Sequence, residues 1–144
     1  MILLDTNVLV YAVNADAPQH SSCQAVVQAA FDRQILAALV PQILLEFLAI
    51  VTHPRIYAPP TNLAAAIDQV DAWLESPSLT LLAESEGYWR ELKSMMRDGR
   101  IAGPHVHDAR VAALCRLHGV RELWTADRDF SRFRGLEFRN PLVP

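Results

Sequence analysis

This 144-residue sequence has one lysine, two cysteines and no long apolar run. What it lacks argues against a membrane protein and against a cysteine-based metal or disulfide site. No uninterrupted apolar run approaches the roughly 18 residues of a membrane-spanning helix, so we expect no contact with a membrane. Asp5 interrupts the apolar N-terminal run and no basic segment precedes it, which does not fit a signal peptide. Cys23 and Cys115 belong to no CxxC pair or Cys/His cluster. Buried free thiols are the best interpretation, and we expect a cytoplasmic protein.

Charge is present in ordinary amount but is unevenly distributed. The formal net charge of −3 by itself argues against a nucleic-acid partner. However, residues 1–89 hold two basic and nine acidic residues, whereas residues 90–144 hold eleven basic and seven acidic ones. All the basic residues of the second part except Lys93 are arginines, which suit bidentate contacts with phosphate. The asymmetry indicates a side that faces a polyanion, although an arginine-rich codon usage would give the same composition.

Short apolar runs alternate with helical patterns along the whole chain. With 51% hydrophobic and 20% charged residues, the sequence has the size and composition of one globular domain, residues 1–144. The expected strands are residues 1–4, 36–40, 79–82 and 123–125, with a short edge strand at 136–138. The expected helices are residues 18–33, 42–53, 61–74, 84–97 and one ending at 117 or 118, with a helical turn at 8–12. This alternation predicts an α/β fold whose mostly parallel sheet is covered by helices on both faces.

Two aspartates stand where apolar strands are expected to end. Asp5 directly follows the run Met1–Leu4, and a second apolar run leads through a threonine to Asp127. Open α/β sheets bind ligands at the carboxyl ends of their strands, so both carboxylates are candidate site residues. For Asp5 alone, a simple helix N-cap would be the more economical interpretation.

Two further acids fall on apolar helix faces. Glu46 lies three residues after Ile43 and four before Ile50, and Asp108 shares its face with Val111. A buried unpaired carboxylate costs several kcal/mol, so each needs an arginine, a proton or a metal ion. A salt bridge or cap would explain either acid singly. Four clustered acids instead favour a divalent cation, and oxygen-only ligands favour Mg²⁺ or Mn²⁺.

Four segments in sequence order together resemble a known family. They are Asp5-Thr6-Asn7-Val8-Leu9, Glu46 in its apolar helix, His107-Asp108-Ala109 with Ala112-Ala113, and Thr125-Ala126-Asp127-Arg128-Asp129-Phe130. In this combination the chain resembles the PIN domain, and more closely the VapC-type toxins of bacterial toxin–antitoxin pairs. The resemblance covers essentially the whole chain. It implies a three-layer α/β/α sandwich and a metal-dependent ribonuclease that an antitoxin holds inactive.

The resemblance also assigns roles to residues. Asp5, Glu46, Asp108 and Asp127 would be the catalytic acids that hold Mg²⁺ or Mn²⁺. Asp129 also matches a family acid, and which of Asp127 and Asp129 binds metal directly stays open. Thr6, Asn7 and Thr125 would orient the carboxylates.

Basic side chains near these acids in sequence are candidates for substrate contacts. Arg128, Arg132 and Arg134 are candidates for contacts with RNA phosphates, and Arg55, Arg97 and Arg100 are weaker ones. Three histidines, His53, His105 and His107, could act as acid or base, but the resemblance gives none of them that role.

The chemistry of such a site fits phosphodiester hydrolysis on its own terms. The reaction needs an activated water and neutralised phosphoryl charge, and Mg²⁺ held by carboxylates supplies both. A haloacid-dehalogenase-like phosphatase is one alternative. It requires a second Asp where this chain has Asn7, and a lysine, whereas the sole lysine, Lys93, sits in a helix pattern. A non-catalytic PIN-like binding module is the other alternative.

An apolar segment predicts a protein partner. Ile56, Tyr57 and Leu63 flank the Pro59-Pro60 loop, and Trp73 and Leu74 end the following helix. We expect an interface there, because a monomer has no use for so much exposed apolar surface. The resemblance implies a homodimer and a cognate antitoxin whose C-terminal tail places an arginine among the acids. Packing of these residues into the core beneath the loop is the alternative.

Overall fold

A single parallel sheet of five strands organises the chain. The computed structural model describes residues 1–143. The sheet has the order β3-β2-β1-β4-β5, and every pairing is parallel. The strands are β1 (Ile2–Leu4), β2 (Ala37–Leu39), β3 (Leu79–Leu81), β4 (Glu122–Trp124) and β5 (Glu137–Arg139). The helices are α1 (Thr6–Val13), α2 (His20–Phe31), α3 (Pro41–Val51), α4 (Leu63–Glu75), α5 (Tyr88–Gly99) and α6 (His105–Leu117), with a short 3₁₀ helix η1 (Arg128–Arg132).

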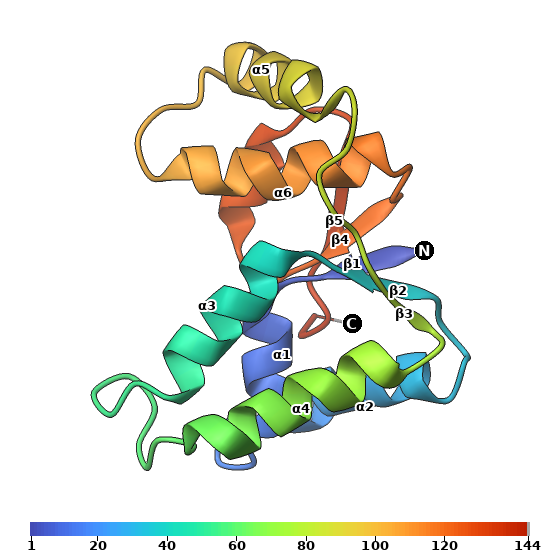
Figure 1. Ribbon diagram of the computed structural model, residues 1–144. Helices are drawn as coiled ribbons and strands as arrows, with labels where there is room; N and C mark the ends of the chain where they lie inside the picture. The colour runs from blue at the N-terminus through green and yellow to red at the C-terminus, as the bar shows by residue number, and fades with distance from the viewer. Residues whose placement is uncertain (144) are drawn as a thin grey trace.

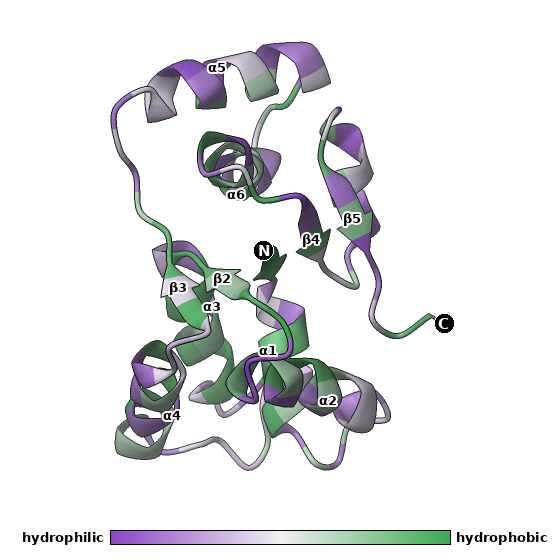
Figure 2. Ribbon diagram, turned by 90° about the vertical axis from the view of Figure 1, so that its right-hand side faces the viewer, coloured by the Kyte–Doolittle hydropathy of each residue, from purple (hydrophilic) through white to green (hydrophobic). Residues whose placement is uncertain are grey.

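The helices form a layer on each face of this sheet (Figure 1). Helices α1 to α4 lie on one side, and α5 and α6 lie on the other, as the turned view in Figure 2 also shows. The chain first adds β2 and β3 on one side of β1, and then returns across the sheet to add β4 and β5. Because these crossovers are right-handed, the helices that lead to β2 and β3 and the helices that lead to β4 lie on opposite faces of the sheet. The predicted three-layer α/β/α sandwich is therefore confirmed.

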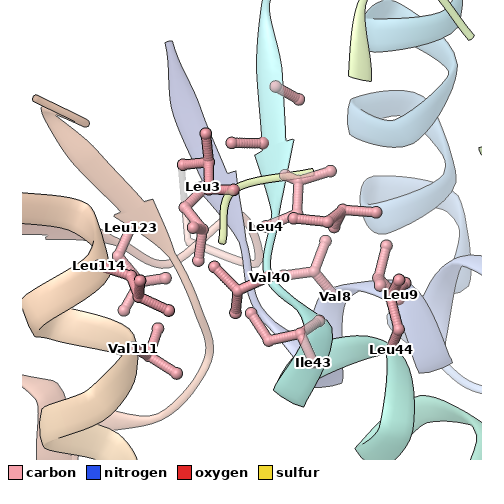
Figure 3. Close-up of a cluster of buried hydrophobic side chains, with 14 of the residues drawn as sticks. Leu3, Leu4, Val8, Leu9, Val40, Ile43, Leu44, Val111, Leu114 and Leu123 are labelled. Atoms are coloured by element: carbon pink, nitrogen blue, oxygen red, sulfur yellow. The ribbon is translucent and has the colours of Figure 1, made fainter. Parts of the chain in front are cut away.

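Buried aliphatic side chains join the layers at the central strands (Figure 3). Leu3, Leu4 and Leu123 of β1 and β4 are completely buried, because both faces of the sheet are covered. From one layer Val8 and Ile43 pack against them, and Val111 and Leu114 approach from the α6 side. This core holds the carboxyl ends of β1 and β4 side by side.

Most element boundaries differ by a few residues from those predicted, including those of α1, α4 and α5. The helical turn expected at residues 8–12 is a full helix, α1. Helix α4 is capped by Asn62, whose side chain accepts a 2.9 Å hydrogen bond from the Ala65 amide, and not by Thr61. Helix α5 begins four residues later than Glu84, because Gly87 adopts a left-handed conformation with φ +88° that ends the preceding turn.

The apolar segment around the Pro59-Pro60 loop divides into a buried and an exposed part. Trp73 is only 1% exposed and packs edge-to-face on Phe47 of α3, with ring centres 4.8 Å apart. The expectation that Trp73 is available to a partner is therefore wrong. Ile56 and Leu63 are 65% and 61% exposed, and Leu74 is 37% exposed. Because these three side chains are exposed, an interface at this segment stays a prediction.

The expectations about thiols and membranes can also be compared with the structure. Cys23 and Cys115 are buried and free, as predicted. Burial raises the pKa of Cys23 to about 11 and that of Cys115 to about 12, so both thiols stay protonated. Within residues 1–143, no helix has the combination of length and apolar character that a bilayer crossing requires.

Candidate active site

The carboxyl ends of β1 and β4 meet at the centre of the sheet. Strand β1 lies between β2 and β4, at the position where the order of strand addition reverses. Such switch points leave a crevice outside the strand ends, where open α/β sheets bind ligands. Asp5 follows β1 directly and Thr125 follows β4, and the Asp5 amide donates a 3.0 Å hydrogen bond to the Trp124 carbonyl. Residues 120 positions apart in the chain thus become neighbours.

The Asp5 carboxylate accepts hydrogen bonds from both strand ends. Oδ2 accepts from the Thr125 hydroxyl at 2.6 Å and from Nδ2 of Asn7 at 2.9 Å, while Oδ1 accepts from the Thr6 amide at 2.8 Å. The bond from Thr6 makes Asp5 the N-cap of α1, so the cap interpretation is confirmed, and the role of Asp5 in a site stays a prediction. Asn7 also accepts a 3.0 Å bond from the Ala126 amide through Oδ1. Thr6, Asn7 and Thr125, which were predicted to orient carboxylates, each donate a hydrogen bond to Asp5.

Burial dominates the electrostatics of Asp5. Its exposed fraction is 7%, and this desolvation raises the pKa of the carboxyl group above its ordinary value of 3.8. The hydrogen bonds from Thr125 and Thr6 lower the pKa in part, and the nearby charges of Glu46 and Asp127 raise it again. A positive charge placed among these acids would therefore stabilise the ionised form.

Glu46 is exposed, so the prediction that helix spacing buries it is wrong. Ile50, one turn further along α3, is itself only half-buried and lines the same cleft as Glu46. That side of the helix therefore faces an opening and not the core. The Glu46 carboxylate accepts hydrogen bonds from the Thr6 hydroxyl at 2.8 Å and from Nε2 of Gln42 at 2.9 Å. Neither donor is a cation, so these bonds leave the Glu46 charge unneutralised.

Asp108 lies half-buried in the first turn of α6. Its Oδ2 is 3.2 Å from Nδ1 of His105, which also lies 3.9 Å from Oδ2 of Asp129. Burial raises the pKa of Asp108, the contact with His105 opposes this shift, and the charges of Asp127 and Asp129 add to it. The four acids are therefore electrostatically coupled across α1, α3, α6 and the end of β4.

One cleft of about 310 Å³ brings the four predicted acids together. Asp5, Glu46, Asp108 and Asp127 line it, whereas Asp129 does not, so Asp127 is the one of the last pair that faces the cleft. Among the cleft residues that the structure describes there is no lysine, arginine or histidine. We call this opening the acidic cleft.

The chemistry of the acidic cleft fits an oxygen-preferring divalent cation. Carboxylate, amide and hydroxyl oxygens are the ligands of Mg²⁺ and Mn²⁺. In residues 1–143, however, no three carboxylate, imidazole or thiol groups lie close enough together to hold an ion among themselves. Because Mg²⁺ commonly keeps several of its waters, one or two direct carboxylates with the others acting through water would match this open arrangement.

The predicted RNA-contacting arginines are not brought together at the cleft. Arg128 is exposed and adjoins Asp127, and the Arg132 guanidinium lies 3.5 Å from Asp129. The main-chain oxygen of Arg134 accepts a hydrogen bond from Arg116, two turns along α6 from the acidic end. The Arg134 segment therefore lies at the opposite end of α6 from Asp108.

Gln42 belongs to the site but was not among the predicted residues. It is 8% exposed, and its Nε2 donates both to Glu46 and, at 3.2 Å, to the main-chain oxygen of His107. It therefore ties α3 to the first turn of α6, next to Asp108. The available signal was its position one helical turn before Glu46.

A family model named PIN domain matches residues 2–136. The chain belongs to the PIN domain family. Two curated relatives of this PIN domain are ribonucleases of Mycobacterium tuberculosis. Ribonuclease VapC43 is 32% identical over 142 residues, which cover 99% of this chain and 96% of the relative. Ribonuclease VapC48 is 29% identical over 137 residues, which cover 95% and 94%. The PIN domain described here is thus similar to VapC ribonucleases over nearly its full length.

Solved structures give the same fold. The crystal structure of VapBC2 from Rickettsia felis, bound to a DNA fragment from its promoter, matches with a TM-score of 0.67. The match has 20% sequence identity and covers 97% of this chain and 98% of that one. At this identity the likeness supports the fold of the PIN domain and is independent of the family match.

Proposed function

We propose that this PIN domain is a divalent-metal-dependent endoribonuclease, a VapC-type toxin inhibited by a cognate antitoxin. One observation carries the proposal: Asp5, Glu46, Asp108 and Asp127, contributed by four separate elements, line one cleft with no basic residue among its described lining. Clustered like charges repel, so four acids that line one cleft favour a bound cation. The relatives named ribonucleases support RNA as the substrate class.

Some residues of the acidic cleft would bind the metal ion, and others would orient the carboxylates that bind it. Asp5, Asp108 and Asp127, with Glu46 at the rim, would hold Mg²⁺ or Mn²⁺. When bound, the ion supplies charge neutralisation at the phosphoryl oxygens and lowers the pKa of an attacking water. Thr6, Asn7 and Thr125 fix the carboxylates of Asp5 and Glu46 through the hydrogen bonds described above. One of the carboxylates would accept the proton of the water as its oxygen bonds to phosphorus, while the P–O bond to the departing ribose oxygen breaks and that oxygen takes a proton from solvent.

The same charge arrangement would suit inhibition by a protein. An arginine from an antitoxin segment, placed in the acidic cleft, would supply positive charge where the ion otherwise binds. Support comes from the VapBC2 likeness in fold and from the family resemblance of the sequence. We expect a homodimer as the free form.

Cleavage of a labelled single-stranded oligoribonucleotide and of total RNA tests the proposal. The wild type should cleave RNA with Mg²⁺ or Mn²⁺ and not with EDTA, and Asp5→Asn should abolish cleavage. Asp68→Asn, which removes an exposed carboxylate on α4, is the matched control and should keep wild-type activity. A wild type that cleaves no RNA with either ion would favour the non-catalytic binding module. RNA cleavage that persists in Asp5→Asn would contradict the assignment of the acidic cleft as the active site.

A further inference from the structure

A second hollow adjoins the acidic cleft on the other side of Asp127. It has a volume of about 440 Å³ and lies along the carboxyl ends of β4 and β5, where its lining includes Ala126, Asp127, Arg128, Phe138, Arg139 and Asn140. We call it the β4–β5 cleft. Asp127 lines both openings, so a molecule bound across Asp127 occupies the two clefts at once.

The charge of the β4–β5 cleft is opposite to that of its neighbour. Besides Asp127, the charged residues that line it are Arg128 and Arg139, and both are exposed. Arg139 faces Trp124 across the strand pair, and its guanidinium carbon lies 4.9 Å from the centre of the indole ring. This stacking limits the freedom of a long side chain and leaves its N–H groups available to an anion.

We propose that the β4–β5 cleft binds the RNA strand next to the cleaved bond, with Arg128 and Arg139 contacting its backbone phosphates. This inference rests on the proposed function of the acidic cleft. A phosphodiester held at the acids continues into further phosphates, and four carboxylates repel each of them. The two arginines stand where the strand leaves Asp127, and they offset that repulsion. Phe138, which is 42% exposed at the same cleft, offers an apolar surface to a base.

The charges also decide between RNA and a protein segment. An inhibitor that brings an arginine to the acidic cleft gains nothing from Arg128 and Arg139, which repel it. A polyanion is attracted to both arginines. The β4–β5 cleft is therefore assigned to the substrate and not to the antitoxin.

RNA binding by the variants Arg128→Ala, Arg139→Ala and the double variant tests the assignment. The probe is a fluorescent 12-nucleotide single-stranded RNA in EDTA, so that binding is measured without cleavage. The double variant should bind at least about tenfold more weakly, because it loses two charge-assisted contacts. The slope of log Kd against log salt should fall by about one for each arginine. With Mg²⁺ present, the loss should appear in KM more than in kcat.

Arg121→Ala is the matched control, because Arg121 is exposed at the amino end of β4, at the opposite edge of the sheet. It should bind RNA as the wild type does. Equal weakening by Arg121→Ala would show unspecific charge attraction and overturn the assignment. So would a double variant that binds RNA normally, or one that loses only its antitoxin complex. In each of these cases, RNA cleavage by the wild type would still support the proposed function. A wild type that neither binds nor cleaves RNA would contradict both the proposed function and the assignment of the β4–β5 cleft.

Discussion

The hydroxyl of Thr125 connects the two strand ends that form the acidic cleft. It donates to the Asp5 carboxylate at 2.6 Å and accepts a 2.9 Å hydrogen bond from the Asp127 amide. Thr125 itself is 1% exposed, so water cannot replace these bonds. One buried side chain therefore sets the positions of two of the four acids.

Thr125→Val removes this hydroxyl while it keeps the shape of the side chain. Asp5 loses a donor to its charged form, so the pKa of its carboxyl group should rise further. RNA cleavage should fall about 10- to 100-fold, as is usual when a residue that orients a metal ligand is lost. The free energy of unfolding should fall by about 1–3 kcal/mol, because the Asp127 amide loses its acceptor. Thr125→Ser retains the hydroxyl, so it should keep most of the RNA cleavage and most of the free energy of unfolding. A fully active Thr125→Val would contradict the orienting role of Thr125.

Glu46→Gln separates a functional carboxylate from a structural one. Its donors, Thr6 and Gln42, are uncharged, so the substitution leaves no buried cation behind. Cleavage should drop strongly while the melting temperature stays within a few degrees of the wild type. Glu75→Gln, on the exposed surface of α4, serves as the control. A destabilised protein that retains nuclease activity would assign Glu46 to structure.

At the level of elements, the acidic cleft brings together carboxylates from the end of β1, the middle of α3, the first turn of α6 and the end of β4, and these like charges repel one another. Burial raises the pKa of Asp5 and Asp108 above the ordinary 3.8, so their ionised forms oppose folding. For such groups stability falls as the pH rises from 3.8 through the raised pKa, and the full cost is present once the pH lies above it. A cation bound in the cleft should offset this cost.

Millimolar Mg²⁺ or Mn²⁺ should therefore raise the melting temperature, and EDTA should lower it. Binding to the folded state alone contributes about 2.7 kcal/mol when the ion is at one hundred times its Kd. Asp5→Asn should melt at nearly the same temperature with and without the ion. A wild-type melting temperature that ignores both ions and EDTA would count against a metal site.

Local patterns were enough to predict most elements and the four acids. The apolar runs of β1 and β4 and the aspartates that follow them are visible in sequence, and parallel strands bring such residues to one edge. The exposure of Glu46 and the positions of Gln42 and Arg139 were not predicted, and the burial of Trp73 against Phe47 was only the alternative. Each depends on which element packs opposite, and that information lies in no single segment of sequence.

At the scale of the whole molecule, helix α4 presents an apolar outer face. Leu63, Ile67 and Leu74 are exposed at spacings that place them on one side of the helix, and the exposed Ile56 precedes it in the loop. Scattered exposed leucines are ordinary, but an aligned row on one helix is typical of a protein interface.

We expect this face to form a homodimer. Sedimentation of the wild type should give a dimer, and the double variant Leu63→Glu with Ile67→Glu should shift it toward monomer without lowering the melting temperature. Ala72→Glu, another exposed position of α4, is a control for added charge on the same helix. A wild type that stays monomeric at high concentration, alone and with its antitoxin, would contradict the interface.

The pairing of β1 with β4 has a consequence for synthesis on the ribosome. Asp5, Glu46 and Asp108 are all translated before Thr125 and Asp127, yet Thr125 is needed to fix the Asp5 carboxylate and Asp127 to complete the cleft lining. An incomplete chain therefore carries most of the acids without the partner that arranges them. Such a chain lacks a complete acidic cleft, so the proposed RNA cleavage should begin only after nearly the whole domain has left the ribosome.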